Sequence, residues 1–326
     1  MKLSIIIPSY NVEKYLSRSV ESALKQTIDD KESLIVVDGA TDKTEEIALN
    51  LAKQDEKVKV IVTENKGVSN ARNVGLTEAQ GEYVCFLDAD DYYESEFIVE
   101  KFYNLCKQYN LDVIRGAYRI FNEEKGEFIE HNPPSFPKIN QVISGQEFLK
   151  SSAIYRFNEV VPWLGLYKKE YLVKTNSLFP VGISYEEDQL FFLNCLLNNG
   201  KFMQTDIYFY VYVKRDTGCT NNLTYKKAQD VAKIVESELN LIKKFSLKNP
   251  LKKYVLKYVS ASFYQLTSIY GRVDKSERKK CVKLVKFSTR VKLMFNAYSK
   301  YIAKKIFLFN FCRIILDKHY DKVKNG

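Results

Sequence analysis

The sequence predicts an α/β protein with a mainly parallel sheet and helices on both sheet faces, followed by a basic, mostly helical C-terminal region. Three observations support this prediction. Short apolar runs alternate with helical patterns in the first hundred of the 326 residues, each apolar run ends in a polar cluster, and the net charge changes sign near residue 220. Because parallel strands need crossover connections, usually helices, the alternation favours a parallel sheet over a set of hairpins.

The first βαβ unit is expected in residues 3–37. Residues 3–7 form an apolar run typical of a buried strand, and residues 33–37 form a second one that leads into Asp38. Between them, the apolar residues of 12–26 recur on one helical face, and Asn11 stands at the position of an N-cap.

The next units repeat this order. Asp42 and Glu45 have the spacing of a capping box, which predicts a helix to about residue 53. Residues 58–63 are then the third strand, 67–79 the third helix and 83–87 the fourth strand.

Beyond residue 110 the pattern weakens. Prolines at 133, 134 and 137 indicate a loop, an apolar helix is expected at 189–197, and Lys- and Tyr-rich helices follow residue 222 with a break at Gly271.

The most informative stretch is 84–91, where an apolar strand runs directly into Asp88, Asp90 and Asp91. Buried strands rarely end in uncompensated charge, and ligands of open α/β sheets bind at the carboxyl ends of strands. Clustered carboxylates without an adjacent Lys or Arg suit a hard divalent cation, which in turn suits a substrate phosphate. The alternative is an acidic cap on a helix beginning near Tyr92.

Polar residues that follow the other strands would join this site at the same sheet edge, and a sugar nucleotide would suit them. Tyr10 is expected to stack on a base, Asp38 to accept from a base imide N–H, and Arg72 to contact the base or diphosphate. Asp88 would then hold the ribose hydroxyls and Asp90 a cation that offsets charge on the departing diphosphate. The structural alternatives are packing for the tyrosine, a turn for Asp38 and a solvated charge for the arginine.

A second acidic cluster occupies residues 186–188. On the opposite wall of the site, Asp188 would take the proton of an acceptor hydroxyl as general base. The alternative is a helix start, because Ser184 and Glu187 have capping-box spacing and an acid in the first turn is favoured by the helix dipole.

Together these segments resemble the nucleotide-sugar-binding half of a family 2 glycosyltransferase with the GT-A fold. Residues 1–100 carry SIIIPSYNVEKYL, IVVDGATDKT, NKGVSNARNVGL and GEYVCFLDADD. Weaker matches continue to about residue 220 in PWLGLYKKEYL, ISYEEDQLFF and YVYVKRDTGCT. The resemblance implies a catalytic domain, and the helical pattern beyond residue 222 predicts a basic helical region after it. The expected boundaries are 1–220 for the catalytic domain, with its nucleotide-sugar half at 1–110 and its acceptor half at 111–220, and 221–326 for the helical region.

The resemblance also implies metal-dependent, inverting transfer of a sugar, usually UDP-linked, to an acceptor hydroxyl, with Mn²⁺ or Mg²⁺ as cofactor. Inversion is a single in-line displacement, so one general base suffices. The roles carried over are nucleotide contacts for Pro8, Tyr10, Asp38, Arg72 and Asp88, metal binding for Asp90 and Asp88, the general base for Asp188, and acceptor-side or supporting contacts for Glu187 and Trp163.

Three positions depart from the family's usual sequence. Members usually read Asp-Asp-Gly-Ser after the second strand, whereas here Val37 replaces the first Asp and Ala40 the Ser. Gly165 stands where a Lys is often found. These changes bear on nucleobase preference and on an acceptor or phosphate contact. The acidic pairs are intact, which favours an active enzyme.

The charge is divided unevenly along the chain. Residues 221–326 contain 25 Lys/Arg and 7 Asp/Glu, a net charge of +18, so residues 1–220 carry −8 of the total of +10. A helix expected in 301–316 mixes Lys with aromatic and aliphatic residues, which favours binding to an anionic membrane surface. The alternative is a helical subdomain packed on the core. Nucleic acid is not expected as a partner, because no recognition motif accompanies the charge.

Composition limits the catalytic chemistry and the cellular location that we expect for this protein. The six cysteines are scattered without metal spacing, which predicts reduced core residues. His131 and His319 are the only histidines, which argues against zinc chemistry or a histidine base. No signal peptide and no run of 18 apolar residues is evident. We therefore expect a cytoplasmic protein, peripheral at the inner face of the cell membrane.

The leading hypothesis is a glycosyltransferase that acts on a lipid-linked saccharide or another glycan in surface-polysaccharide or capsule synthesis. Two alternatives stay open at this point. A nucleotidyltransferase on a related sheet would release pyrophosphate instead of a nucleoside diphosphate. A non-catalytic protein would bind the nucleotide sugar without turnover.

Overall fold

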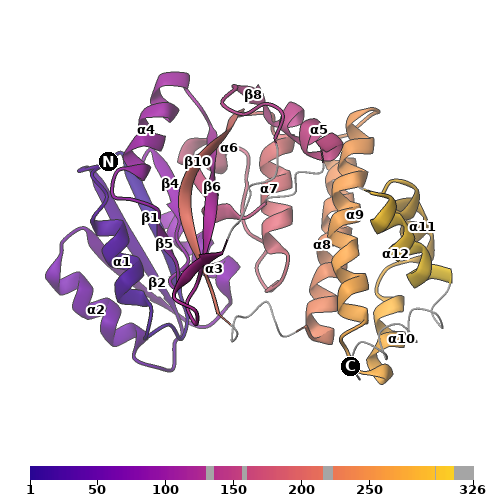
Figure 1. The fold of residues 1–326 in the computed structure, drawn as a ribbon, viewed down its shortest axis with the longest axis horizontal. Helices are drawn as coiled ribbons and strands as arrows, with labels where there is room; N and C mark the ends of the chain where they lie inside the picture. The colour runs from indigo at the N-terminus through magenta and orange to yellow at the C-terminus, as the bar shows by residue number, and fades with distance from the viewer. Residues whose placement is uncertain (130–135, 156–159, 216–222, 298, 312–326) are drawn as a thin grey trace.

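The computed structural model describes residues 1–129, 136–155, 160–215, 223–297 and 299–311. Within these ranges the strands form one ten-stranded mixed sheet (Figure 1). In chain order the strands are β1 (Leu3–Ser9), β2 (Lys31–Asp38), β3 (Val58–Thr63), β4 (Tyr83–Phe86), β5 (Tyr92–Tyr93), β6 (Val113–Asn122), β7 (Glu127–Ile129), β8 (Ile143–Ser144), β9 (Gly165–Lys168) and β10 (Lys201–Lys214).

The strand order is β3-β2-β1-β4-β9-β6-β10-β5, with β7 beside β6 and β8 beside β10. β1 pairs in parallel with β2 and β4, and β2 pairs in parallel with β3. β9 runs antiparallel to both β4 and β6. Every residue of β1, β2 and β4 is buried, which explains why apolar residues follow one another in these strands instead of alternating with polar ones. The predicted mainly parallel sheet is confirmed.

Seven α-helices and one short 3₁₀ helix accompany the described part of the sheet. α3 approaches the sheet closely, because a Cβ added at Gly75 would lie 2.4 Å from Cγ2 of Ile6 in β1. The glycine therefore permits the close contact of this helix with the strand. The helices are α1 (Leu16–Leu24), α2 (Thr44–Gln54), α3 (Val68–Glu78), α4 (Ile98–Tyr109), α5 (Gly145–Tyr155), η1 (Pro162–Leu164), α6 (Lys169–Lys174) and α7 (Glu187–Leu197).

The start of α1 differs from the expected helix at 12–26. Asn11 does not cap it, because its φ of 52° places it in the left-handed region. Its side-chain oxygen accepts a hydrogen bond from the Thr41 N–H at 2.8 Å. Asn11 thus ties the loop after β1 to the loop after β2, and α1 begins only at Leu16.

The described C-terminal helices pack through α5 and α7 against the part of the chain that contains the sheet (Figure 1). α9 contacts α5, α8 and α12, while α7 contacts α8, and their buried apolar residues belong to the same core as the sheet. The structure therefore confirms that this region packs on the core, while its binding to a membrane surface stays a prediction. The helices are α8 (Tyr225–Lys244), α9 (Leu251–Tyr270), α10 (Lys275–Lys283), α11 (Phe287–Phe295) and α12 (Lys300–Phe311).

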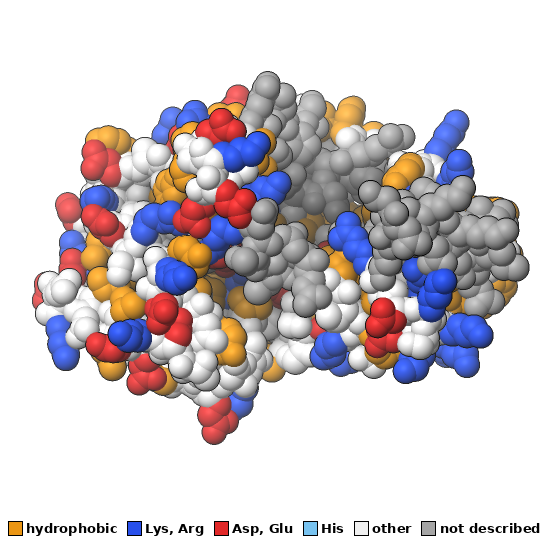
Figure 2. Space-filling model, turned by 60° about the horizontal axis from the view of Figure 1, so that its bottom comes forward, with side chains coloured by type: hydrophobic (Ala, Val, Ile, Leu, Met, Phe, Trp, Pro, Cys, Tyr) orange, Lys and Arg blue, Asp and Glu red, His pale blue; other side chains and the backbone are white. Residues whose placement is uncertain are grey.

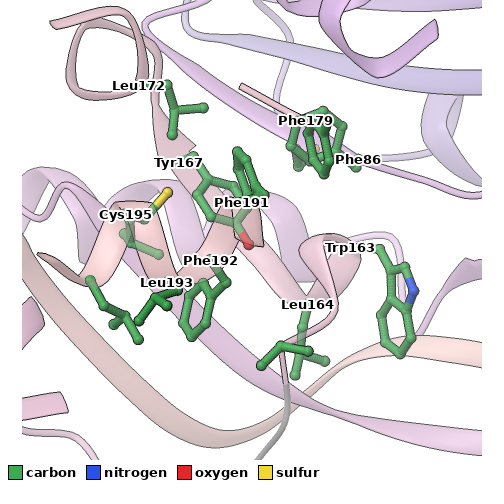
Figure 3. Close-up of a cluster of buried hydrophobic side chains, with 14 of the residues drawn as sticks. Phe86, Trp163, Leu164, Tyr167, Leu172, Phe179, Phe191, Phe192, Leu193 and Cys195 are labelled. Carbon is green, nitrogen blue, oxygen red and sulfur yellow. The ribbon is translucent and has the colours of Figure 1, made fainter. Parts of the chain in front are cut away.

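An aromatic cluster joins α7 to the sheet (Figure 3). The rings of Phe179 and Phe191 stack with centroids 4.1 Å apart, and Phe86 of β4 meets Phe179 edge-on at 5.3 Å.

Four cysteines are buried and free, as predicted: Cys85, Cys106, Cys195 and Cys281. The other two, Cys219 and Cys312, lie outside the described residues, as do both histidines and residues 312–316 of the predicted membrane helix.

Candidate active site

Residues from several elements meet at the carboxyl edge of the parallel strands. Tyr10 follows β1, Asp38 ends β2 and Asp88 follows β4 by two residues. The parallel pairing of β1 with β2 and β4 brings these three strand ends together. The structure therefore confirms the predicted arrangement of polar residues along one sheet edge, which is where ligands of open α/β sheets bind.

A buried arginine joins the two acidic clusters. Arg72 of α3 donates to Asp88 at 3.0 Å, to Asp188 at 3.0 Å and to Glu187 at 3.2 Å, and its side chain is 4% exposed. Its guanidinium also lies over the Phe179 ring, 5.2 Å from the centroid. Burial acts to lower the pKa of Arg72, but the three carboxylates outweigh it and raise the pKa above the ordinary value for arginine, so Arg72 remains a cation. The solvated-charge alternative for this residue is wrong.

Asp188 lies in the first turn of α7. Burial raises the pKa of its carboxyl well above the ordinary value, and Glu187 raises it further, while the Arg72 cation opposes the shift. A raised pKa moves a carboxylate toward the range in which it can accept a proton from a hydroxyl. The geometry and electrostatics therefore suit the predicted base.

The capping-box alternative for Glu187 is wrong. The N-cap residue of α7 is Glu186. The side chain of Ser184 instead donates to Asp230 of α8, and Glu187 contacts Arg72. Tertiary partners have replaced the local bonds that the spacing suggested.

Asp90 is paired with an arginine that sequence reasoning missed. Arg215, next to the end of β10, donates to the Asp90 carboxylate, and its guanidinium lies 4.0 Å from the centroid of the Tyr15 ring. Burial raises the pKa of Asp90, the Asp88 charge adds to the rise, and Arg215 opposes it. The segment YVYVKRDTGCT contained the signal, since a basic residue directly follows a strand there.

The carboxylates Asp88 and Asp90 suit a divalent cation only together with ligands from the substrate and water. Within the described ranges, no group of three or more His, Cys, Asp or Glu side chains is arranged to hold a metal. Asp88 and Asp90 each direct one carboxylate oxygen to an arginine. A cation here would therefore be held by one or two carboxylates together with substrate phosphates and water, which is how Mg²⁺ is commonly bound in nucleotide sites.

Asp91 has a structural role. Its side chain is almost completely buried and accepts from the Tyr210 hydroxyl at 3.0 Å and from the Val213 N–H at 2.7 Å. The same hydroxyl accepts from the Asp88 N–H at 3.0 Å. Residues 92–93 form strand β5, so the alternative of a helix cap at this point is wrong. Asp91 and Tyr210 hold the loop that carries the other two carboxylates.

Trp163 supports this loop from behind. Its ring stacks on Tyr210 with centroids 4.3 Å apart and an interplanar angle of 17°, and only 7% of the residue is exposed. A direct contact of Trp163 with an acceptor stays a prediction.

The residues predicted to bind the nucleotide differ in their exposure and in their hydrogen bonds. Asp38 is buried and accepts from the backbone N–H groups of Lys66 and Gly67, at 2.9 and 2.8 Å, just before α3. Tyr10 is 48% exposed, so its ring is accessible for stacking. Pro8 is buried within β1, in register with Val36. The nucleotide roles of these residues stay predictions.

Two of the departures from the family sequence have a packing explanation. Val37 is fully buried in the core, where a charged Asp would be costly. A Cβ at Gly165 would lie 1.9 Å from the carbonyl oxygen of Ile114, so this backbone excludes a lysine there.

Comparison with known proteins identifies the family. Residues 4–158 match the profile of Glycosyl transferase family 2. An uncharacterized glycosyltransferase of Nostoc sp. (strain PCC 7120) is 31% identical over 237 residues, covering 70% of this chain and 69% of the relative. The chain belongs to glycosyl transferase family 2.

Other comparisons extend this family assignment. The uncharacterized glycosyltransferase EpsJ of Bacillus subtilis is 32% identical over 70% of this chain, which spans 65% of its length. The crystal structure of S. aureus TarS 1-349 superposes with a TM-score of 0.70 at 21% identity, covering 99% of this chain and 92% of TarS 1-349. A second structure of that protein holds UDP-GlcNAc. The superposition shows that this family 2 chain has the GT-A fold, including a helical C-terminal region.

Proposed function

We propose that this chain is an inverting, metal-dependent glycosyltransferase that moves a hexosyl or N-acetylhexosaminyl group from a UDP-sugar to a glycan hydroxyl. The acceptor we propose is a lipid-linked saccharide in surface-polysaccharide or capsule synthesis. One observation carries the proposal: Arg72 binds Asp88 of the donor side and Asp188 of the acceptor side at once. A candidate donor residue and a candidate base are thereby held at one point.

The residues divide the reaction between them. Asp188 takes the proton of the acceptor hydroxyl as the oxygen attacks the anomeric carbon, while Arg72 holds its carboxylate in place. A Mn²⁺ or Mg²⁺ ion, held by Asp90 and Asp88, would supply Lewis-acid stabilisation of the departing diphosphate. Arg215 lies beside Asp90 as a second cation near that charge. Because inversion takes one displacement, no residue is needed as a covalent nucleophile.

Support for a UDP-linked donor comes from two sources. The exposed ring of Tyr10 at the sheet edge offers a surface for a base to stack on. The structurally similar TarS binds UDP and UDP-GlcNAc. The first supports a nucleotide donor and the second a uridine nucleotide, and neither names the sugar.

The decisive test is release of nucleoside diphosphate from a panel of UDP-, GDP- and dTDP-sugars, with Mn²⁺ and with EDTA. Metal-dependent release of UDP from one donor supports the proposal and names the sugar. Release of pyrophosphate would instead support a nucleotidyltransferase. UDP-sugar binding with no turnover on any glycan or lipid-linked acceptor would support a non-catalytic binder.

An anionic membrane surface at the cytoplasmic face is proposed as the second partner. Among the charged side chains visible at the right of Figure 2, Lys and Arg predominate over Asp and Glu. A groove of about 450 Å³ between α8 and α11 has an apolar wall that includes Val235, Leu239 and Leu284. Its four lysines suit the phosphates of anionic lipids. They are Lys243, Lys252, Lys286 and Lys292.

None of the described helices is long and apolar enough to cross a membrane. Sedimentation with liposomes therefore tests the membrane proposal directly. The protein should sediment with phosphatidylglycerol vesicles at low salt, and substitution of the four groove lysines by Gln should weaken this. A matched variant with four Gln at Lys53, Lys57, Lys101 and Lys125, outside the helical region, should still sediment. Failure of the unaltered protein to sediment would refute the proposal.

A further inference from the structure

Two helices of the basic C-terminal region contact the segment that carries the candidate base, residues 184–189. On one side, Asp230 of α8 accepts hydrogen bonds from the Ser184 N–H and hydroxyl, at 3.2 and 3.1 Å. On the other side, the Tyr258 hydroxyl of α9 donates to the backbone carbonyl of Gln189 at 2.9 Å. Asp188 and its neighbour Glu187 lie between these two anchors.

Both anchors are withdrawn from water. Asp230 has no exposed surface and Tyr258 is 2% exposed. The second carboxylate oxygen of Asp230 pairs with Lys226 at 2.8 Å. A buried carboxylate needs partners for both oxygens, and the other oxygen of Asp230 accepts from Ser184, just before the candidate base.

The backbone between the anchors is strained. Glu186, the residue before the acidic pair, has a φ of 66°, which is uncommon for a residue other than glycine. Its side-chain Oε2 is buried and has no hydrogen-bond partner among the described residues. Such a conformation persists only where its surroundings over-determine it, and strained residues of this kind cluster at functional sites. The hydrogen bonds at Ser184 and Gln189 constrain the chain on both sides of Glu186.

We propose that α8 and α9 fix the geometry of the Glu187–Asp188 turn, with Asp230 and Tyr258 as positioning residues for the base. This inference rests on the proposed function, because it concerns how Asp188 is held for proton transfer. Arg72 holds the turn from the side of α3, and α8 and α9 hold it from the other side. The helical region thereby takes part in catalysis through packing, whether or not it binds a membrane.

The test compares four single variants of the full chain. Tyr258→Phe and Asp230→Ala each remove one anchor, whereas Asp230→Asn keeps an oxygen that accepts from Ser184. Thr267→Val is the matched control, since it removes a buried hydroxyl from α9 that bonds its own helix. The measurements are kcat and donor KM for UDP release, together with hydrogen exchange of peptides covering 184–189.

We expect Tyr258→Phe and Asp230→Ala to lower kcat roughly 10- to 100-fold, because small misplacements of a catalytic group have effects of this size. Donor KM should stay within about twofold, since these two residues bond the segment of the candidate base and not a candidate donor residue. Asp230→Asn should recover most of the loss, and Thr267→Val should match the unaltered protein. Exchange at 184–189 should rise in the two anchor variants only.

A second comparison separates positioning from loss of folding. In an Asp188→Asn background, Tyr258→Phe should cause no further loss of rate, because the group that it positions is already disabled. The inference would be overturned if Tyr258→Phe lowered the rate equally in the unaltered protein and in the Asp188→Asn background. It would also be overturned if both Tyr258→Phe and Asp230→Ala had the same kcat as Thr267→Val. An unaltered protein that turns over no donor would overturn the proposed function itself, which is a different result.

Discussion

Removing the charge of Arg72 should destabilise the fold and not only the site. Arg72→Met keeps an apolar chain of similar length but leaves Asp88, Asp188 and Glu187 without the cation that each contacts at 3.0 to 3.2 Å. Breaking a buried ion pair from one side costs about 3–5 kcal/mol, because the remaining charge is left uncompensated. We expect a loss of that size in the free energy of unfolding at pH 7.5, measured in urea, together with loss of UDP release.

Arg119→Met is the matched control. Arg119 forms an ion pair with Glu94 at 3.0 Å, but its side chain is 46% exposed. Exposed pairs contribute at most about 1 kcal/mol, so this variant should unfold close to the unaltered protein. Equal unfolding free energies for the Arg72 and Arg119 variants would refute the assignment of Arg72 as the central buried cation.

The destabilisation by Arg72→Met should depend on pH in a defined direction. The folded-state pKa of Asp188 is already raised by burial, and removal of Arg72 takes away the charge that lowers it. A carboxyl with a raised folded pKa stabilises the fold when protonated and loses that contribution as pH rises through its folded pKa. The variant should therefore lose less stability relative to the unaltered protein near pH 5 than at pH 8. A penalty that grows toward low pH would contradict this account.

The remaining predictions concern single side chains. Asp188→Asn should keep UDP binding, measured by calorimetry, and lower transfer by about 10²–10⁴-fold, since a general base contributes that much; unchanged transfer would remove Asp188 from this role. Asp90→Asn should raise the Mn²⁺ concentration needed for half-maximal UDP release, and an unchanged titration would exclude Asp90 as a metal ligand. Tyr210→Phe should cost about 1–3 kcal/mol in urea unfolding, because it leaves an oxygen of buried Asp91 unpaired. The Tyr103 hydroxyl donates to the partly exposed Glu82 at 3.3 Å, so Tyr103→Phe should cost less unfolding free energy. An equal loss for the two variants would contradict a special role for Tyr210.

Local signals predicted the sheet and its functional edge well. Buried parallel strands are apolar runs, so residues 3–7, 33–37 and 83–87 identified β1, β2 and β4. Acidic residues placed directly after such a run have few purely structural explanations. Asp88 could therefore be assigned to a site before its surroundings were known.

The partners of these residues could not be predicted in the same way. Arg72 meets carboxylates 16 and 116 positions further along the chain, and Arg215 meets Asp90 across 125 positions. The spacing of Ser184 and Glu187 predicted a local capping box, yet both side chains bond residues that are distant in sequence. No local pattern encodes such pairings, because they depend on which strand ends and helix starts the folded chain brings together.

The sequence by itself determined the fold class, the family, the sheet edge that carries the candidate site and the acidic residues there. Each follows from hydrophobic periodicity or from residue types at strand ends, which are properties of neighbouring positions. Only the tertiary structure decided which cation holds each carboxylate and which acid is structural. It also decided that α8 and α9 form hydrogen bonds with the residues on both sides of the Asp188 turn. Burial and charge pairing are set by the whole fold, so the electrostatics of the site exist only once the distant segments have packed.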